Sequence, residues 1–583
     1  MTVCKGKGQR GAMPWSATCL IGLALAIVGC APTNGTGGGA QQPSPSAPSR
    51  TLVMMTQIDP LLAPSPLASG TSTGRGSLAD VLFTAGLSHD DQARDNTAVT
   101  VWPQLAETLP QLDTDSWRVF PDGRMETTWV LRPGLTWHDG APLTGDDVVF
   151  GWQVRNTPEY VPAGDLQLID EVVAKDSRTV VVRWKAPYFA AGAGGSVGSP
   201  MPRHVLGEAF AQQTPQQFAS HPYFGVTNYV GAGPYRLERW EPGSFLEGSA
   251  FDGYTLGRPS IDRIRLAIVS DKNTALANML AGEVQMSFDA ALFIEQGGIL
   301  KQQWGKSNGG TVSLEADQIR FVAFQLKKEF VNPTQILDVR VRQALAVAID
   351  KRGFIDGLLG GDGYVAETLM APYVPFYAQI ERVAQKYPYD LQRAAQLLAD
   401  VGFSKGADGS YRLPSGEPFS LTLMASSGYD RERAILADMW RKAGIDIKEQ
   451  DVSVTQDADR QFRAAFPAAY GTSQNLGLPG ALGRLNGRTI ATPENRFSGN
   501  NYFGYSNPEF DRLLDVTATS LRQDERVAAT IEAVRIASID LPFVPMYLNP
   551  RSASAFSSSL QAPTTSPASK PGWWNIEAWK WKS

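Results

Sequence analysis

The amino-acid sequence predicts an α/β protein built from more than one domain. At 583 residues the chain is too long for one ordinary hydrophobic core. From Thr51 onward, strand-like and helix-like segments alternate irregularly, without a repeat of fixed length. Hydrophobic residues make up 43% of the chain and charged residues 19%, as is ordinary for a globular protein.

The first thirty residues differ in composition from the rest of the chain. Three basic residues precede an apolar run, Ala17–Val28, which is short for a permanent membrane span. The run ends in IVGC (27–30), which resembles the lipobox of bacterial lipoproteins. The resemblance implies that residues 1–29 are a lipoprotein signal peptide and that Cys30 is lipidated. An ordinary secretory peptide that contains a cysteine is the alternative.

The segment after Cys30 and the cysteine count agree with an exported protein. All three cysteines lie at or before the proposed cut, so the mature chain has no disulfide and depends on its core for stability. Residues 31–50 are rich in Gly, Pro and Ser and have too few apolar groups to fold. As a flexible tether, these twenty residues would reach roughly 25 Å.

The charge balance argues against a nucleic-acid partner. The whole chain has 53 basic and 58 acidic residues. Removal of residues 1–29 takes away Lys5, Lys7 and Arg10, which leaves 50 basic groups against 58 acidic ones, a net charge of −8. Such mild acidity does not favour binding to phosphate backbones or to an anionic membrane surface.

The strands are predicted from residue type and alternation. β-branched and aromatic residues gather at 178–184, 261–269 and 320–326. Around residue 129, Trp129 and Leu131 alternate with polar or smaller neighbours, which is the period of a half-buried strand.

Three helices are predicted from the residues at their ends. Asp338 is a suitable N-cap for an amphipathic helix, and Asp390 is suitable for another that Gly402 closes in a left-handed conformation. Asn507 caps a third helix, with Pro508 at its first position.

The stretch LTWHDGAPLTGDDVVFGW (135–152) carries residue types found in metal and acid/base sites: His138, Asp139, Asp146 and Asp147. A structural interpretation accounts for them better. Asp139-Gly140 is a turn dipeptide, and Thr144 with Asp147 matches a capping box. Acidic residues are also favoured in the first turn by the helix dipole. None of the chain's four histidines has another at helical spacing, as a metal site would favour.

The same stretch closely resembles the signature of the extracellular solute-binding proteins of family 5, the dipeptide- and oligopeptide-binding components of bacterial ABC importers. Further blocks resemble this family and follow in its order: VGAGPYRLERWEPG (230–243), LGRPSIDRIRLAIVSDKNTALANMLAGEVQM (256–286), LDVRVRQALAVAIDK (337–351), PYDLQRAAQLLADVGF (388–403), NNYFGYSNPEFDRLLD (500–515) and LPFVPMY (541–547). The resemblance covers essentially the whole mature chain.

The resemblance implies a two-lobe, periplasmic-binding-protein-like fold of type II, with two crossing strands between the lobes and a subdomain inserted in lobe I. The expected parts are the signal peptide 1–29, the lipidated cysteine and linker 30–50, lobe I at 51–95, 228–316 and 542–583, the inserted subdomain 96–227, and lobe II at 317–541.

The function implied by the resemblance is that of a substrate-binding lipoprotein, which captures a peptide or peptide-like solute by lobe closure and delivers it to an ABC permease. It implies no catalysis, no cofactor, a monomer, and a lipid-anchored location outside the cytoplasm. Two alternatives stay open. One is a receptor of the same fold for an oligosaccharide, a glycoconjugate or a metal chelate, and the other is a secreted hydrolase.

One segment departs from the family. Peptide-binding relatives usually supply an aspartate here that pairs with the ligand's free α-amine. The segment 460–493 has no acidic residue, but it has four arginines: Arg460, Arg463, Arg484 and Arg488. We expect a ligand without a free amine at this point, unless another acid such as Asp59 replaces the missing one. We expect the arginines on solvent-exposed faces.

By analogy with the family, ligand contacts are predicted from both lobes. The predicted residues are Asp59, Leu61 and Leu62 on lobe I, and Tyr470, Gly471, Thr472, Asn475, Asn500, Asn501 and Tyr502 on lobe II. Tyrosine and asparagine side chains can stack on a polar ligand and hydrogen-bond to it.

Overall fold

A large mixed sheet carries most of the fold. Its strands are β1 (Thr51–Thr56), β8 (Tyr235–Glu241), β9 (Phe245–Ala250), β10 (Arg263–Ile268), β11 (Met286–Phe293), β12 (Gly310–Phe324), β13 (Tyr364–Val365), β16 (Ser420–Ala425), β17 (Asp446–Gln450), β18 (Ala469–Asn475) and β19 (Phe543–Ser557). This 11-stranded sheet has the order β17-β16-β18-β12-β19-β11-β1-β10-β9-β8, with β13 paired to β19. The computed structural model describes residues 50–57, 62, 78–90, 101–160, 164–194, 197–224, 229–360, 363–372, 374–475, 480–561 and 573–582.

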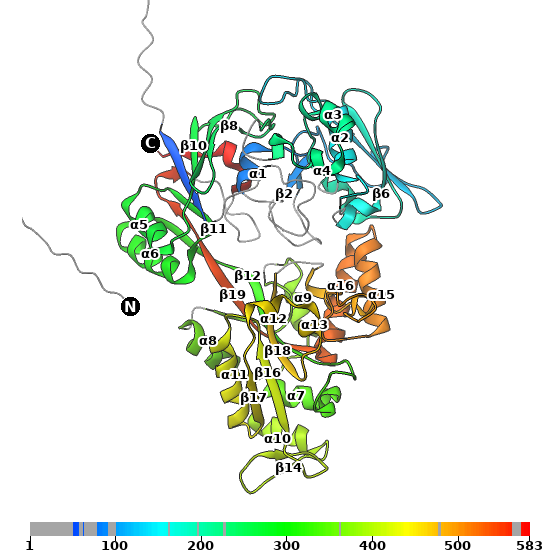
Figure 1. Ribbon diagram of the computed structural model, residues 1–583, viewed down its shortest axis with the longest axis vertical. Helices are drawn as coiled ribbons and strands as arrows, with labels where there is room; N and C mark the ends of the chain where they lie inside the picture. The colour runs from blue at the N-terminus through cyan, green and yellow to red at the C-terminus, as the bar shows by residue number, and fades with distance from the viewer. Residues whose placement is uncertain are drawn as a thin grey trace, which may run out of the picture. The chain divides into compact units, whose positions relative to one another are not determined.

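Two strands of 15 residues, β12 and β19, connect the two halves of this sheet (Figure 1). They pair antiparallel from Gly310 opposite Ser557 to Ala323 opposite Phe543. β19 also pairs with β11 on one side, and β12 pairs with β18 on the other. The register shifts twice between Glu315 and Gln318. The ladder is therefore irregular midway between the two halves, where bulges bend a strand.

A second sheet has four strands in the order β4-β5-β7-β6. Their bounds are β4 (Trp117–Val119), β5 (Met125–Val130), β6 (Ile169–Ala174) and β7 (Thr179–Trp184). Met125, Thr127 and Trp129 of β5 are buried and alternate with more exposed neighbours, which confirms the predicted period of two. The strand predicted at 178–184 is β7, and the one predicted at 261–269 is β10. The one predicted at 320–326 is the second half of β12.

The α-helices are α1 (Leu78–Phe83), α2 (Gly145–Arg155), α3 (Arg203–Gln212), α4 (Pro215–Phe218), α5 (Lys272–Ala281), α6 (Ile294–Ser307), α7 (Val339–Val347), α8 (Lys351–Leu359), α9 (Tyr377–Val383), α10 (Leu391–Ala399), α11 (Asp430–Lys442), α12 (Val454–Ala458), α13 (Arg460–Ala464), α14 (Gly480–Gly483), α15 (Pro508–Thr519) and α16 (Gln523–Asp540). Short strand pairs complete the fold: β2 (Ser88–Asp90) with β3 (Val101–Pro103), β14 (Ser404–Lys405) with β15 (Tyr411–Arg412), and β20 (Leu560–Gln561) with β21 (Lys580–Trp581).

All three predicted helix starts are confirmed. The Asp338 side chain accepts a hydrogen bond from the Arg340 N–H at the start of α7, and Asp390 accepts from the Arg393 N–H at the start of α10. Asn507 caps α15. Gly402 has φ 85° after the end of α10, the left-handed conformation predicted for it.

Side chains of β12 alternate between two hydrophobic cores, one on each face of the sheet. Ile319, Phe321 and Ala323 pack in a core with residues of α15 and α16. Val322 and Phe324 pack on the opposite face with residues of α7, α10 and α11. Figure 1 shows these helices around the β16–β18 part of the sheet. A strand with a core on both sides must be apolar at almost every position.

Arg320 is an exception to this apolar rule, because it is a charged residue with 0% exposure on β12. Its guanidinium binds the Glu432 carboxylate of α11 through two hydrogen bonds of 2.9 Å. The Tyr547 hydroxyl of β19 donates to the same carboxylate at 2.8 Å, and the Arg320 guanidinium lies over the Tyr429 ring. Because a buried charge needs a close partner, this network ties β12, β19 and α11 together.

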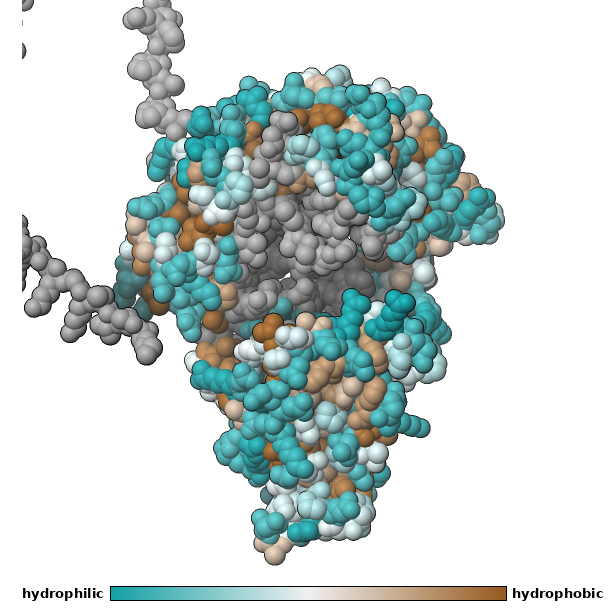
Figure 2. Space-filling model, viewed as in Figure 1, coloured by the Kyte–Doolittle hydropathy of each residue, from teal (hydrophilic) through white to brown (hydrophobic). Residues whose placement is uncertain are grey.

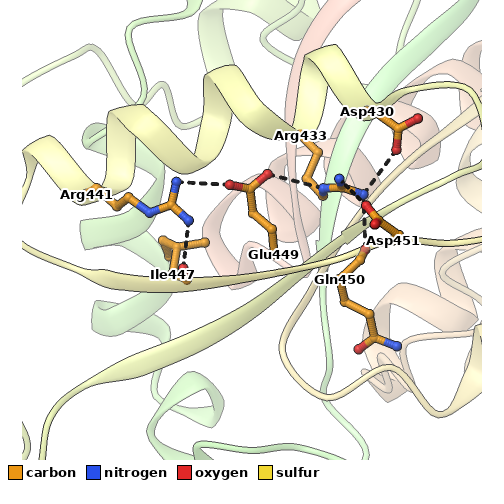
Figure 3. Close-up of polar contacts among 7 residues, drawn as sticks. All are labelled: Asp430, Arg433, Arg441, Ile447, Glu449, Gln450 and Asp451. Atoms are coloured by element: carbon orange, nitrogen blue, oxygen red, sulfur yellow. Dashed lines mark hydrogen bonds and ion pairs between the residues drawn. The ribbon is translucent and has the colours of Figure 1, made fainter.

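A second charge network holds α11 against β17 (Figure 3). The buried Arg433 guanidinium bonds to Glu449 at 3.3 Å and to Asp451 at 2.5 Å. Arg441, two turns further along α11, donates to the other Glu449 oxygen at 2.9 Å. Glu449 therefore joins two arginines of one helix to one strand.

The surface shown in Figure 2 is mostly hydrophilic, with small separate hydrophobic areas. Large exposed apolar side chains such as Val454 and Tyr364 are far apart in the sequence. Within the described ranges, no helix combines the length and the apolar character needed to cross a bilayer.

We expect Glu432→Gln to lower the free energy of unfolding by about 3–5 kcal/mol, because it leaves the Arg320 charge buried without a carboxylate. Urea denaturation measures the change. The matched control on the same helix is Asp438→Asn, which removes the exposed ion pair with Lys442 and should alter stability little. Equal effects of the two substitutions would contradict the role assigned to Glu432.

Candidate functional site

The 135–152 stretch forms a turn and a helix start. The predicted capping box is present at the start of α2, where the Asp147 carboxylate accepts from the Thr144 N–H at 2.8 Å. The same carboxylate accepts from the Arg203 N–H at 3.0 Å and so positions the start of α3. Asp139 accepts from the His204 ring at 2.7 Å. Asp147 and Asp139 therefore have structural partners.

His138 connects two of the sequence blocks. Its ring Nε2–H donates to the Gly233 carbonyl at 3.0 Å, and its backbone N–H donates to the Gly231 carbonyl at 2.9 Å. A Cβ at Gly231 would lie 2.0 Å from the Phe83 carbonyl oxygen, so only glycine allows this close approach. Among the described residues, no group of three or more His, Cys, Asp and Glu side chains is arranged to hold a metal ion.

The predicted lobe I contacts are described only in part. Asp59 and Leu61 lie outside the described residues, as does Cys30. Leu62 is 3% exposed and packs in a core with residues of β1 and β10. Its side chain therefore contributes to packing.

Tyr470 and Thr472 are brought together on β18, where side chains at alternate positions share one face. The Tyr470 hydroxyl donates to Asp457 of α12 at 2.5 Å, and burial raises the pKa of Tyr470. The Thr472 hydroxyl accepts from the Ser426 hydroxyl at 3.2 Å. Both hydroxyls already have partners among the described residues.

Gly471 and Asn475 have backbone roles that the structure describes. A Cβ on Gly471 would lie 3.5 Å from a Glu432 carboxylate oxygen, so this residue lies against the buried ion pair of Arg320. Asn475 ends β18 and pairs with Gln318 of β12. The Asn475 side chain lies outside the described part of the structure.

Gln474, which the sequence analysis did not single out, shares a face of β18 with Tyr470. It is 5% exposed, and neither its amide oxygen nor its amide nitrogen has a hydrogen-bond partner among the described residues. Leaving a buried amide unpaired is costly. An uncharged amide here can donate to and accept from a polar ligand group.

The loop before α15 is organised by Asn501. Its side-chain nitrogen donates to the Tyr505 carbonyl at 2.8 Å, and its side-chain oxygen accepts from the Gly504 N–H at 3.0 Å. Asn501 is fully buried, whereas Asn500 is exposed. These bonds fix the backbone on which Tyr502 is presented, so Asn501 positions Tyr502.

Two arginines of the acid-free segment lie on the surface, as expected. Arg460 is exposed on α13, and Arg488 is exposed and pairs with Asp515 at 2.6 Å. An exposed arginine at either position is an ordinary surface residue.

The other two arginines depart from that expectation. Arg463 and Arg484 are partly buried, and both guanidinium groups lie over the Tyr502 ring, at 4.8 and 5.6 Å from its centroid. The absence of acids from 460–493 was visible in the sequence, but not the meeting of these three side chains. Arginine, tyrosine and the Gln474 amide are residue types that can bind a polar solute by hydrogen bonds and charge.

Comparison with known proteins agrees with these observations. Residues 107–476 match the family model described as bacterial extracellular solute-binding proteins, family 5 Middle. The oligopeptide-binding protein AppA of Bacillus subtilis is 25% identical over 528 residues, which cover 86% of this chain and 90% of that protein. Protein XP55 of Streptomyces lividans is 29% identical over 529 residues, 88% of this chain and 85% of XP55.

Solved structures have the same fold. The periplasmic oligopeptide-binding protein of an oligopeptide ABC transporter from Thermotoga maritima superposes with a TM-score of 0.69 at 21% identity, covering 90% of this chain and 97% of that one. This is a two-lobe periplasmic-binding fold, as predicted.

We expect His138 to make folding stability depend on pH. Burial lowers the pKa of His138 to about 4, from 6.5 when unfolded. The unfolded chain therefore binds the extra proton between these values, so stability is full above pH 6.5 and falls as the pH drops toward 4. The loss is at most about 3 kcal/mol.

The measurement compares wild type with His138→Gln, whose amide can still donate to the Gly233 carbonyl. The stability advantage of wild type should shrink from pH 7 to pH 4.5. Glu577, whose pKa burial raises to about 7, acts in the opposite direction but is present in both proteins and cancels. A difference that does not change with pH would contradict the role of His138.

Proposed function

Since the chain belongs to the bacterial extracellular solute-binding proteins of family 5, we propose that it captures a peptide or peptide-like solute and delivers it to the membrane permease of an ABC importer. The family consists of solute-binding proteins rather than enzymes. In our proposal the solute is bound and released unchanged, and a secreted hydrolase is the alternative.

The observation that carries the proposal is the pair of strands β12 and β19. They are the hydrogen-bonded connection between the β11 side and the β18 side of the sheet, and their register is broken at Glu315–Gln318. A short irregular segment in two connecting strands that lie side by side can absorb a hinge motion while the flanking cores stay rigid. A solute that contacts both lobes only when they are closed shifts the population toward the closed form.

We propose the division of the chain that the family resemblance implies. Lobe I comprises 51–95, 228–316 and 542–583, with the inserted subdomain at 96–227, and lobe II comprises 317–541. The hinge would lie at the lobe boundary near residue 316. This boundary coincides with the register shifts of β12, which supports the division.

For the location we propose a lipid-anchored monomer outside the cytoplasm. The support is the basic and apolar start of the chain, the IVGC block that ends in Cys30, and the Gly/Pro/Ser-rich linker 31–50. The anchor would keep the protein within reach of the permease.

The ligand class is proposed from the acid-free segment. A ligand ammonium placed beside β18 would lack a carboxylate from 460–493, which costs roughly 3–5 kcal/mol, or a hundred- to thousand-fold in affinity. We therefore favour a solute that is neutral or anionic at this point, such as an N-blocked peptide. An oligosaccharide or glycoconjugate is the second candidate, favoured by the uncharged Gln474 amide.

We expect binding to compact the protein without consuming the solute. Native mass spectrometry of the purified protein should find retained cargo, and small-angle scattering should show a smaller radius of gyration with cargo than after its removal. An unchanged radius with no cargo ever bound would refute the receptor function. Chemical conversion of the cargo would favour the hydrolase.

We also expect the binding site to tolerate a blocked amino terminus. In calorimetric titrations, N-acetylation of a tripeptide should weaken binding less than about tenfold. The reason is that segment 460–493 offers no carboxylate to the free ammonium, so acetylation breaks no ion pair there. A hundredfold loss on acetylation would show that an acid such as Asp59 replaces the missing clamp.

A further inference from the structure

Arg463 and Arg484 place two positive charges over one aromatic ring. Arg463 is in the last turn of α13, and Arg484 directly follows α14. Their guanidinium carbons are 4.8 and 5.6 Å from the centre of the Tyr502 ring. Cation–π contact attracts each guanidinium to the ring, but the two guanidiniums repel each other.

These two charges have no acidic partner within the described part of the chain. Neither arginine forms an ion pair of 4.0 Å or less with a described residue, and the buried Nε of Arg463 has no hydrogen-bond partner there. Residues 476–479, the undescribed stretch between β18 and α14, are Leu, Gly, Leu and Pro and carry no charge. Burial lowers the pKa of Arg484, and the Arg463 charge lowers it further.

Asp457 on the neighbouring helix α12 forms no ion pair of 4.0 Å or less with either arginine. One of its carboxylate oxygens accepts from the Tyr470 hydroxyl at 2.5 Å, and the other accepts from the Ser427 N–H at 3.1 Å. Its hydrogen bonds are thus directed to Tyr470 and to the loop before α11.

Other buried cations of this protein have a carboxylate or a backbone carbonyl as partner. Lys327 donates to the Ala491 carbonyl at 3.2 Å, and the Arg342 guanidinium donates to the Leu541 carbonyl at 3.0 Å. Arg320 binds Glu432, and Arg433 binds Glu449. Lys351 is paired with Glu367 at 2.9 Å. A partly buried cation pair with neither a carboxylate nor a carbonyl partner among the described residues therefore departs from how this chain treats its other buried charges, and it is the arrangement expected where an anion arrives from outside.

We propose that Arg463 and Arg484, held over Tyr502, bind a carboxylate of the transported solute. The proposal rests on the proposed receptor function and specifies one end of its ligand. A planar guanidinium pairs with a carboxylate through two parallel hydrogen bonds, and two guanidiniums can share its oxygens. Because Tyr502 already holds both side chains, little freedom is lost on binding.

The two arginine charges also determine whether this end of the site selects an anion or a cation. Two adjacent positive charges repel an ammonium and attract an anion, so this end of the site has the opposite preference to an acidic clamp. The solute class is then an acid whose amine is blocked or absent.

The test uses two matched libraries of N-acetylated tri- to pentapeptides, one with free carboxyl termini and one with amidated termini. Each is incubated with the full-length protein, and retained peptides are quantified by mass spectrometry. We expect the free-carboxyl library to be retained at least about tenfold better, as charge-assisted hydrogen bonds imply.

Arg463→Gln and Arg484→Gln should each remove most of this preference, by about tenfold or more, whereas Arg463→Lys should retain part of it. The matched controls are Arg460→Gln on the same helix and Arg488→Gln, both exposed, which should leave the preference unchanged. Arg484→Gln should not lower the thermal midpoint of the cargo-free protein, because it removes a charge that has no carboxylate partner among the described residues. A purely structural arginine would lower it.

The possible results distinguish the proposed carboxylate site from the proposed receptor function. Equal retention of both libraries, or equal losses in the control variants, would overturn the carboxylate site and leave the receptor function standing. Failure of wild type to retain either library would refute a peptide-like solute, and the carboxylate site would fall with it.

Discussion

The backbone pairing of β12 with β19 is the constraint on which the rest of the structure depends. It joins the strands on the β11 side to those on the β18 side within one sheet. The ladder runs along both strands with register shifts at Glu315–Gln318 and at Arg320/Phe321, so each side keeps its own cores while sharing the same two strands. A solute-binding protein needs rigid halves and one place that can bend, and this topology supplies both.

Charge is handled differently in the scaffold and at the candidate site. In the scaffold, Arg320 and Arg433 are buried against carboxylates, which turns an expensive group into a cross-link between helix and strand. At the candidate site, Arg463 and the Gln474 amide have buried atoms without partners among the described residues. Binding sites commonly keep such unsatisfied groups, because the ligand satisfies them.

Local features were predictable from the residues themselves. The caps at Asp338, Asp390 and Asn507, the capping box at Thr144 and the alternation around Trp129 each depend on neighbours within a few positions. The same holds for the turn and helix start of 135–152. Its acidic side chains resemble those of a metal or acid/base site, but Asp139 and Asp147 accept hydrogen bonds from the nearby backbone N–H groups of Ala141 and Thr144. The order of the sequence blocks then sufficed to predict the family and its two-lobe fold.

Tertiary structure alone decided which polar groups are paired and which have no partner among the described residues. Arg320 and Glu432 are 112 positions apart, and neither residue's neighbourhood reveals the other. The absence of acids from 460–493 was visible in the sequence, yet exposed arginines were expected throughout. Whether an arginine lies in water or over Tyr502 depends on how α13, α14 and the Asn501 loop converge, and no local pattern encodes that convergence.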